Sequence, residues 1–500
     1  MTGKNYLAMD FGASTGRGIV GSFDGKRLTL REVHRFQNYF VPVGGNYYWD
    51  AFRLFHEILL AVTKAGHAEG TAGLYSIGID TWGTDYGLLD ENGQLLGNCR
   101  CMRGADGTYV EMVNREASPE YLFERTGIQT IYGNTLFQIY ERVHCQDPAI
   151  REAKHLLMLP DLLAYFLTGE KHHEYTMATT SMMYHPLQRD WDRELLRKLK
   201  LPDHIFSDIL MPAQTSFPLL PQILKECDAR ELRYVPVGTH DTASAVAAVP
   251  LRQREAFCSS GTWSLLGVET KQPVLTREVY EANFSNEGTV DGGIRLLKNI
   301  MGMWIVQQFM KEWEQEGQAL SWDEVVGQAS RIEAFRSFIA VEDPVFYQAG
   351  HMIQRVQEYC RKTNQPVPVS VGELSRCVYE SLAMQYRKTF ETLEHILGYR
   401  LEALRIVGGG CRNKMLNQFA ANALKRPVYA GPVECACVGN ILVQAMENGE
   451  IGSFGQLREA AADSFPVETY EPADMDLWDE GYEKYKAVMR AGAACKDYSD

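Results

Sequence analysis

The chain has 500 residues, which at roughly 150 residues per domain allows two large domains or about three smaller ones. It carries 50 Lys and Arg against 64 Asp and Glu, a net charge of −14, and 45% of its residues are hydrophobic. These proportions exclude a disordered or collagen-like chain, and the acidic balance disfavours non-specific binding to nucleic acid. They leave open the binding of a small anion in a local pocket.

Neither a membrane span nor a signal peptide is predicted. No segment reaches the roughly 18–20 unbroken apolar residues that a membrane helix needs, and the N-terminus lacks an apolar signal core. The 11 cysteines, an odd number, indicate a reducing compartment, so a cytoplasmic location is expected. The pairs Cys99/Cys101 and Cys435/Cys437 lack the spacing of a structural zinc site.

The N-terminal part predicts an α/β domain. Residues 5–23 indicate a strand, a tight loop and a second strand, and residues 28–36 a third strand. Apolar residues at helical spacing predict a helix over 51–65, and the apolar run 74–80 predicts a buried strand. Three strands, a helix and a further strand suit a mixed sheet.

The middle of the chain, from about 103 to 224, is richer in helix signals and turns, and we interpret it as an insertion carried by that domain. Within it, Pro160-Asp161 and residues 172–183 are expected to form loops. A second α/β unit is expected from about Tyr234. Its segment 256–268 has an apolar run, a polar loop with Gly and a second apolar run, as in the N-terminal hairpin, which indicates a faint internal duplication.

The C-terminal part alternates strands and helices, as is typical of a parallel sheet. The predicted elements are a helix over 373–397, a strand over 403–407, a loop of three glycines, a helix over 414–424, a strand over 427–430, a helix over 437–447 and a last helix over 475–489.

The segment Asp10-Phe-Gly-Ala-Ser-Thr-Gly-Arg17 is the first candidate for chemistry. An aspartate at a strand end can hold Mg²⁺ through water, loop N–H groups can cradle phosphate, and Arg17 can add a cation. An ordinary hairpin with a Gly and Ser turn is the alternative. Ser259-Ser260-Gly261-Thr262 is its counterpart in the second half, and two such hairpins would allow a cleft to grip one triphosphate.

Two further segments follow predicted strands. Gly408-Gly-Gly-Cys-Arg-Asn413 resembles a dinucleotide fingerprint but lacks the third glycine and a ribose-binding acid, so a nucleobase or ribose platform is preferred to a dehydrogenase site. Asp241, in Gly238-Thr-His-Asp-Thr-Ala-Ser-Ala245, is either a helix N-cap or a general base for a substrate hydroxyl. The chain has no P-loop, Gly-x-Ser-x-Gly or His-Glu-x-x-His motif.

In order and spacing, these segments resemble the motifs of the FGGY family of carbohydrate kinases. The resemblance extends from Tyr6 to about Tyr470, and its further stretches are Leu30–Phe36, Ser76–Gly83, Glu174–Thr180, Gly238–Val246, Ser259–Leu266 and Leu297–Gly302. It implies an α/β fold of two actin-like ATPase domains of the ribonuclease H-like type, with a nucleotide cleft between them. It also implies ATP and Mg²⁺ as cofactors and a small-molecule ketose as substrate, with no nucleic-acid or membrane partner, in a monomer or homodimer.

Within that family, these further stretches carry a narrower resemblance, to members that transfer the γ-phosphoryl group of ATP to O1 of L-rhamnulose. L-fuculose and D-xylulose are the alternative substrates. A non-enzymatic actin-like nucleotide switch is the alternative of a different class.

The resemblance also implies roles for individual residues. Asp241 is the catalytic base, and Asp10 organises Mg²⁺. The substrate-binding residues are Gly83, His240, Asp241, Thr242 and Asn299. The ATP-binding residues are Ala13, Ser14, Thr15, Gly16, Arg17, Thr262, Gln307, Gly408, Gly409 and Gly410.

Two departures from the family pattern bear on the choice of sugar. Where these kinases usually carry Tyr-Arg-Asp-Ser-Arg, this chain has Met102-Arg103-Gly104-Ala105-Asp106, and Met177 stands where Asn is usual. Cys360 and Cys377 match positions that pair in a relative, but free thiols are expected in a reducing compartment. The expected domains are 1–244, which includes the insertion, 245–465, and a C-terminal helix and tail over 466–500.

Overall fold

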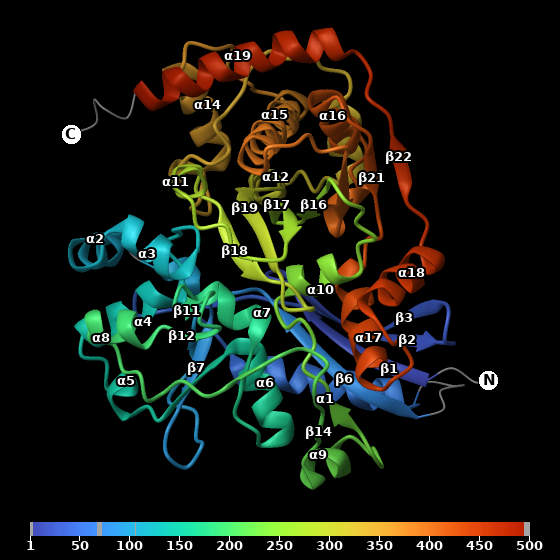
Figure 1. Cartoon of the computed structure of the whole chain (residues 1–500). Helices are drawn as coiled ribbons and strands as arrows, with labels where there is room; N and C mark the ends of the chain where they lie inside the picture. Colours follow the sequence, from blue (N-terminus) through green and yellow to red (C-terminus); the bar gives the residue numbers. More distant parts are fainter. Residues whose placement is uncertain (1–3, 68–72, 106, 495–500) are drawn as a thin grey trace. The chain divides into compact units, whose positions relative to one another are not determined.

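The structure is a computed structural model that describes residues 4–67, 73–105 and 107–494 (Figure 1). The chain folds into two compact units, each assembled from segments that are distant in sequence. The first comprises Met1–Pro250, Glu269–Leu297 and Glu434–Phe465, and the second comprises Leu251–Val268, Lys298–Val433 and Pro466–Asp500. The family-domain boundaries at 1–244, 245–465 and 466–500 stay a prediction.

A six-stranded sheet in the order β14-β15-β6-β1-β2-β3 forms the centre of the first unit. The predicted N-terminal hairpin is confirmed, and the parallel pairing of β1 with β6 places the ends of these two buried strands together. The strands are β1 (Lys4–Phe11), β2 (Thr15–Phe23), β3 (Leu28–Gln37), β6 (Leu74–Thr81), β14 (Phe217–Pro218) and β15 (Arg233–Tyr234).

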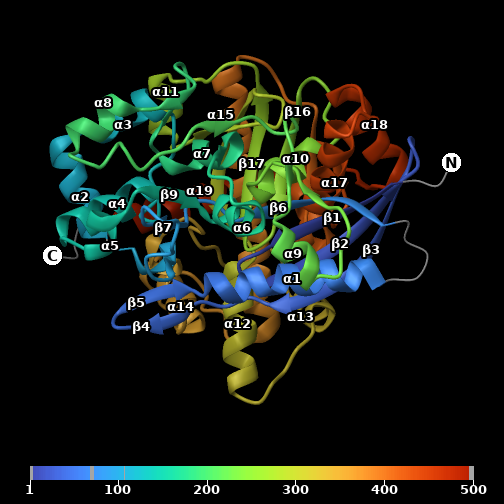
Figure 2. The same ribbon diagram turned by 90° about the horizontal axis from the view of Figure 1, so that it is seen from below.

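Helices cover both faces of this sheet, as Figure 2 shows from below. Helix α1 (Ala51–His67), predicted over 51–65, packs Leu54 and Ile58 into a core with Leu7 and Met9 of β1. Helix α17 (Cys435–Glu447) contacts β1 and β6 from the side to which Gly78 points, because a Cβ at Gly78 would lie 2.3 Å from Oδ1 of Asn440. The sequence predicts helix α17, but nothing in the local pattern assigns it to the first unit.

The predicted helix-rich insertion is present and has its own hydrophobic core. Its helices are α2 (Gly107–Glu116), α3 (Pro119–Thr126), α4 (Thr135–His144), α5 (Pro148–Glu152), α6 (Leu159–Thr168), α7 (Tyr175–Ala178), α8 (Arg193–Lys198) and α9 (Pro221–Glu226). The loop expected at Pro160-Asp161 is wrong, because both residues lie in the first turn of α6, where proline needs no N–H partner. Residues 172–183 are not an open loop either, since they form short buried turns that include α7.

The second unit repeats the same strand arrangement. The hairpin of β16 (Glu255–Ser260) and β17 (Trp263–Thr270) pairs in parallel with β20 (Ala403–Val407) through β16, as the first hairpin pairs with β6 through β1. The sheet continues through β21 (Val428–Ala430) to β22 (Glu468–Tyr470). Its helices are α12 (Trp304–Gln315), α13 (Trp322–Ala329), α14 (Met352–Lys362), α15 (Val371–Leu397), α16 (Lys414–Leu424) and α19 (Met475–Ala494).

Helix α10 (Asp241–Ala247) of the first unit packs very closely against α17. A Cβ at Gly439 of α17 would lie 1.8 Å from the backbone oxygen of Ser244, so this crossing requires glycine. Because Asp241 is the first residue of α10, the crossing also fixes the position of that carboxyl group.

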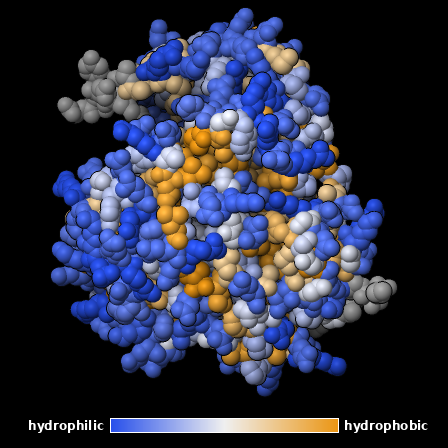
Figure 3. All heavy atoms as spheres, viewed as in Figure 1, coloured by the Kyte–Doolittle hydropathy of each residue, from blue (hydrophilic) through white to orange (hydrophobic). Residues whose placement is uncertain are grey.

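The face drawn in Figure 3 is mainly hydrophilic. Across the part of the chain that the structure describes, no helix combines the length and the apolar character that a membrane crossing requires. Cys360 and Cys377 are unpaired thiols in the structure.

Candidate active site

Two aspartates lie side by side where β1 and β6 end. The parallel register pairs Asp10 with Asp80, and both side chains are buried. Asp80 accepts a hydrogen bond from Nδ2 of Asn440 at 2.6 Å, while its Oδ1 is buried without a partner. Burial and the charge of Asp10 raise the pKa of Asp80 well above its ordinary value.

Arg17 does not present a free cation. The antiparallel register places it opposite Asp10, and its guanidinium lies 2.9 Å from Oδ2 of Asp10 and forms a second ion pair with Glu434. The turn between the strands offers N–H groups instead, because the amides of Ala13 and Ser14 have no partner among the described residues. These amides can bind phosphate oxygens.

The Asp241 carboxyl group has one occupied and one open oxygen. Its Oδ1 accepts hydrogen bonds from the backbone N–H of Thr242 and, at 3.1 Å, from the Thr242 hydroxyl. Its Oδ2 has no partner in the described chain, and 33% of the side chain is exposed. Burial and the charge of Asp10 raise the pKa of Asp241 to about 7.

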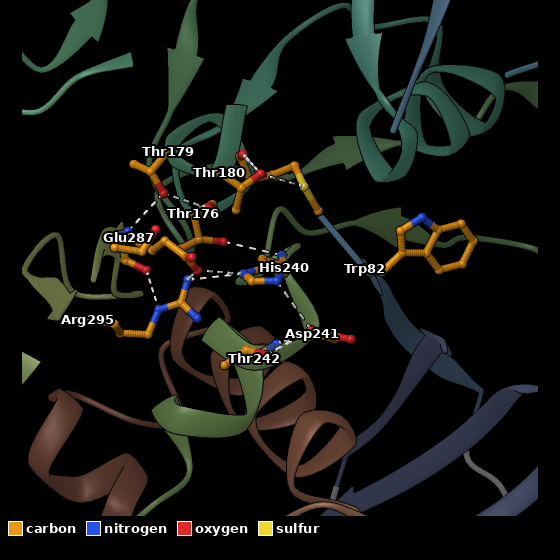
Figure 4. Close-up of polar contacts among 12 residues, drawn as sticks. Trp82, Thr176, Thr179, Thr180, His240, Asp241, Thr242, Glu287 and Arg295 are labelled. Carbon is orange, nitrogen blue, oxygen red and sulfur yellow. Dashed lines mark hydrogen bonds and ion pairs between the residues drawn. The ribbon is translucent and has the colours of Figure 1, made fainter. Parts of the chain in front are cut away.

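His240, which directly precedes helix α10, is a buried neutral imidazole (Figure 4). Its Nε2 lies 3.5 Å from Oδ1 of Asp241, and its Nδ1 lies 3.2 Å from the guanidinium of Arg295. Burial and the positive charge of Arg295 hold the pKa of His240 well below its ordinary value.

Glu174 connects the insertion to the segment that carries His240 and Asp241. Its buried carboxylate accepts hydrogen bonds from both the N–H and the hydroxyl of Thr176 at 2.7 and 2.6 Å. It also accepts from the N–H and hydroxyl of Thr239 at 3.1 and 2.6 Å. These hydrogen bonds hold residues 174–177 next to Thr239, which directly precedes His240.

Gly83 adjoins Thr180 in this region. A Cβ at Gly83 would lie 3.3 Å from Oγ1 of Thr180, so the two residues are in direct contact. Figure 4 shows Trp82, the neighbour of Gly83, on the side of His240 and Asp241 that lies away from Arg295. The first unit therefore contains the predicted sugar-binding residues Gly83, His240, Asp241 and Thr242, of which His240 and Thr242 contact the Asp241 carboxylate.

The second unit brings together the remaining predicted ATP-binding residues. Thr262, in the turn after β16, donates a hydrogen bond of 3.3 Å to Oε1 of Gln307. A Cβ at Gly408 or Gly410 would lie 2.9 or 2.0 Å from atoms of Ser260, so the glycine loop packs directly on the end of β16. A Cβ at Gly409 would meet nothing within 4 Å, which leaves this backbone open to a ligand.

Asn299 lies in β19 (Ile294–Met301), in the part of the strand that belongs to the second unit. Asp106, in the loop that departs from the family pattern, lies outside the described residues. Sequence reasoning assigned no role to Glu174 or Arg295. For Arg295 the available signal was a charged residue between Ile294 and Leu296, and for Glu174 it was a place at the start of one of the stretches that resemble the family.

Comparisons with known proteins identify the family of this chain. Residues 5–247 match the N-terminal domain, and residues 256–447 the C-terminal domain, of the FGGY family of carbohydrate kinases. The rhamnulokinase of Bacteroides thetaiotaomicron is 39% identical over 493 residues, which cover 97% of this chain and 100% of that protein. The rhamnulokinase of Bacillus subtilis is 35% identical over 477 residues, covering 94% and 96%.

Solved structures of similar fold include a ligand-bound xylulose kinase from Lactobacillus acidophilus, with a TM-score of 0.81 and 14% identity over 98% of this chain and 99% of that one. A Plasmodium falciparum glycerol kinase with ADP has a TM-score of 0.76 and 15% identity, covering 98% of each chain. The chain belongs to the FGGY family of carbohydrate kinases and has the two-domain α/β fold of that family. It is a sugar kinase, and ATP is its phosphoryl donor.

Proposed function

We propose that this kinase transfers the γ-phosphoryl group of ATP to O1 of L-rhamnulose, giving L-rhamnulose 1-phosphate and ADP. The curated relatives named rhamnulokinase, which match nearly the whole chain, support this substrate. The observation that carries the chemistry is the Asp241 carboxyl group, whose open Oδ2 faces an exposed region beside a neutral histidine.

Asp241 is the base in this proposal. A carboxyl group with a pKa of about 7 is half ionised at neutral pH, and a base of that strength accepts the proton of a sugar hydroxyl as the hydroxyl attacks phosphorus. Hydrogen bonds from Thr242 to Oδ1 fix the orientation of the carboxylate and leave Oδ2 for the substrate. Gly83 and His240 would bind the sugar at the same place.

We assign the nucleotide contacts to one group of residues in each unit. The amides of Ala13 and Ser14 in the first unit would bind phosphate oxygens, and Arg17 would act mainly by ordering Asp10. In the second unit, Thr262 and Gln307 would contact the nucleotide next to the glycine loop, where Gly409 is open to a ligand. The proposal requires that the γ-phosphate of ATP reach Asp241.

The residues around Asp10 fit a magnesium ion held jointly with phosphate. No group of three or more His, Cys, Asp or Glu side chains within residues 4–67, 73–105 and 107–494 is arranged to bind a metal alone. Mg²⁺ typically uses one or two carboxylates, waters and substrate phosphates, and Asp10 with the partnerless Oδ1 of Asp80 supplies such a set. When bound, Mg²⁺ neutralises charge on the transferred phosphoryl group.

The choice among ketoses depends on the loop that departs from the family pattern. Met102 is anchored by its N–H to Oδ1 of Asp85 at 2.9 Å, and Asp85 also accepts a hydrogen bond of 2.8 Å from the Trp82 indole. The loop is thus tied to the residue next to Gly83, so its altered sequence bears on sugar recognition. L-fuculose and D-xylulose are the competing substrates.

A panel of acceptors tests the proposal. ADP release is measured with MgATP and L-rhamnulose, L-fuculose, D-xylulose, L-ribulose or glycerol. We expect kcat/KM for L-rhamnulose to exceed the others by at least about tenfold. The ³¹P signal of the product should split through coupling to the two protons of a CH₂ group, as attachment at O1 requires. A preference for another acceptor, or a product phosphorylated at a secondary carbon, would refute the assignment.

Several expectations lie beyond the site itself. A cytoplasmic location, a monomeric or homodimeric state and the lack of nucleic-acid and membrane partners stay predictions.

A further inference from the structure

A fully buried arginine lies next to the proposed sugar site. Arg295 of β19 has 0% exposure and is among the largest completely buried side chains of the described chain. A buried charge costs several kcal/mol unless it is paired and hydrogen-bonded. Its Nε donates a hydrogen bond of 2.8 Å to the backbone oxygen of Gly288, and one terminal nitrogen, NH2, reaches Glu287 at 3.4 Å.

The same terminal nitrogen makes the contact that points toward the site. Arg295 NH2 lies 3.2 Å from Nδ1 of His240, and Figure 4 shows the guanidinium on the side of the imidazole opposite Asp241. A guanidinium only donates hydrogen bonds, so Nδ1 of His240 must carry the lone pair. The proton of the neutral ring is then on Nε2, which lies 3.5 Å from Oδ1 of Asp241.

We propose that Arg295 is a positioning residue of the kinase, which fixes the tautomer and the ring orientation of His240 so that its Nε2–H group faces the Asp241 carboxylate and the sugar. Arg295 acts through His240, because it is shielded from solvent and lies behind the imidazole. Without it, Nδ1 can also hold the proton, and Nε2 then presents a lone pair toward a carboxylate. The inference rests on the proposed roles of Asp241 and His240.

The surroundings of Arg295 make this role specific to His240. Glu287 also lies 3.5 Å from Nδ1 of His240, so the carboxylate and the guanidinium compete for that nitrogen. A carboxylate alone accepts a hydrogen bond from Nδ1–H and favours the opposite tautomer. Arg295 contacts both groups and thereby decides between them.

A spectroscopic experiment tests the tautomer directly. The full-length protein is labelled with ¹⁵N-histidine, and the His240 signals are identified by their loss in His240→Gln. In the wild type we expect the pattern of a neutral ring with its proton on Nε2. In Arg295→Met we expect a mixed or Nδ1–H pattern, and in Arg295→Lys a largely retained Nε2–H pattern. An unchanged Nε2–H tautomer in Arg295→Met would overturn the proposal.

Steady-state kinetics give the functional readout with a matched control. Arg295→Met should lower kcat/KM for the ketose about 10- to 100-fold, as loss of an orienting partner typically does, with the KM for ATP unchanged. Arg142→Met removes another buried arginine, paired with Asp147 at 2.8 Å, and should leave the kinetics nearly unchanged. Wild-type kinetics in a folded Arg295→Met protein would contradict the proposal.

A double-mutant cycle covers the case in which Arg295→Met fails to fold. In the His240→Gln background, Arg295→Gln should lower kcat/KM for the ketose by a smaller factor than it does in the wild type, because its target nitrogen is absent. Equal costs in both backgrounds would show that Arg295 does not act through His240. If the ketose itself is misassigned, the wild type shows no turnover with it, whereas the tautomer experiment still reports on Arg295.

Discussion

The Asp241 carboxyl group gains its basicity from burial and from the nearby charge of Asp10. Because these effects raise its pKa to about 7, the group is mainly protonated below that pH and cannot accept the sugar proton there. We predict that kcat/KM for the ketose rises about tenfold per pH unit below this value and levels off above it. The measurement is ADP release between pH 5.5 and 9 at constant ionic strength, and a flat profile would exclude Asp241 as the titrating base.

Glu174 is the residue whose loss should most disturb the sugar site without removing a substrate contact. At pH 8 we expect Glu174→Gln to destabilise the protein by about 2–4 kcal/mol, because an amide N–H₂ would face N–H and O–H donors in a buried position. The urea midpoint should fall, and kcat should fall with it. Glu324→Gln, at an exposed capping box of α13, is the control and should cost less than about 1 kcal/mol. An equal loss of stability in Glu174→Gln and Glu324→Gln would show that the buried hydrogen bonds of Glu174 do not hold this region together.

Residues with a chemical role differ in how far the sequence discloses them. Asp10 and Asp241 follow strand-like runs and adjoin Gly, Ser or Thr, so their positions were predictable from local pattern. Arg17 was also identified, but its pairing with Asp10 and Glu434 depends on a strand register and a distant segment. Arg295 and Glu174 depend wholly on such long-range contacts and were missed.

The crossing of α10 and α17 is the contact between elements that most directly holds Asp241 in place. Gly439→Ala places a methyl group against the backbone oxygen of Ser244, where a Cβ would be only 1.8 Å away. We predict a loss of roughly 1–3 kcal/mol in stability from overpacking, together with a lower kcat, since α10 must shift and carry Asp241 with it. Thermal unfolding and the ADP-release assay provide the two readouts.

Gly327→Ala is the matched control for that substitution. Gly327 lies inside α13, and a Cβ there would meet nothing within 4 Å. The alanine should therefore be neutral or stabilise the protein by up to about 1 kcal/mol through helix propensity. A Gly439→Ala protein that behaves like Gly327→Ala would show that the helices can separate without cost to the site.

Elements with a strong local signal were predicted almost to the residue. The strand over 403–407 and the helix over 414–424 coincide with β20 and α16. The error at Pro160-Asp161 arose because proline ends helices in their interior but is favoured in the first turn. The helix over 437–447 was found, but its packing partner was not, since periodicity reveals an apolar face and not what covers it.

On the scale of the whole molecule, the first unit contains segments from both halves of the chain, whereas the segments of the second unit all come from the C-terminal half. Residues 269–297 and 434–465 return to the first unit after the chain has entered the second. The first of these segments supplies Arg295 and the second supplies Asn440 and Gly439, so both support the sugar site. A linear division of the sequence cannot show such exchanges, because nothing local marks the points where the chain crosses.

Ligand-dependent hydrogen exchange should separate the two sets of binding residues. We predict that L-rhamnulose protects residues 174–180 and 238–242, which Glu174 ties together. A non-hydrolysable MgATP analogue should protect 260–262 and 408–413, since these segments form one contiguous surface in the second unit. Protection of residues 408–413 by the sugar alone would contradict the assignment of separate sugar-binding and nucleotide-binding residues.

The net charge of −14 concerns solubility more than ligand binding. ATP is itself an anion, and Arg17, the cation of the first hairpin, is already shared between two carboxylates. We therefore expect backbone amides to bind the triphosphate, together with an accompanying Mg²⁺ as proposed.

Asp241 is the proposed base for phosphoryl transfer to the ketose, and Asp241→Asn removes that function alone. The asparagine keeps the shape of the side chain but cannot accept a proton. In a single-turnover experiment with L-rhamnulose and MgATP, the rate of sugar-phosphate formation should fall roughly 10²- to 10⁴-fold, with nucleotide affinity unchanged. A variant that forms L-rhamnulose 1-phosphate at nearly the wild-type rate would contradict the account.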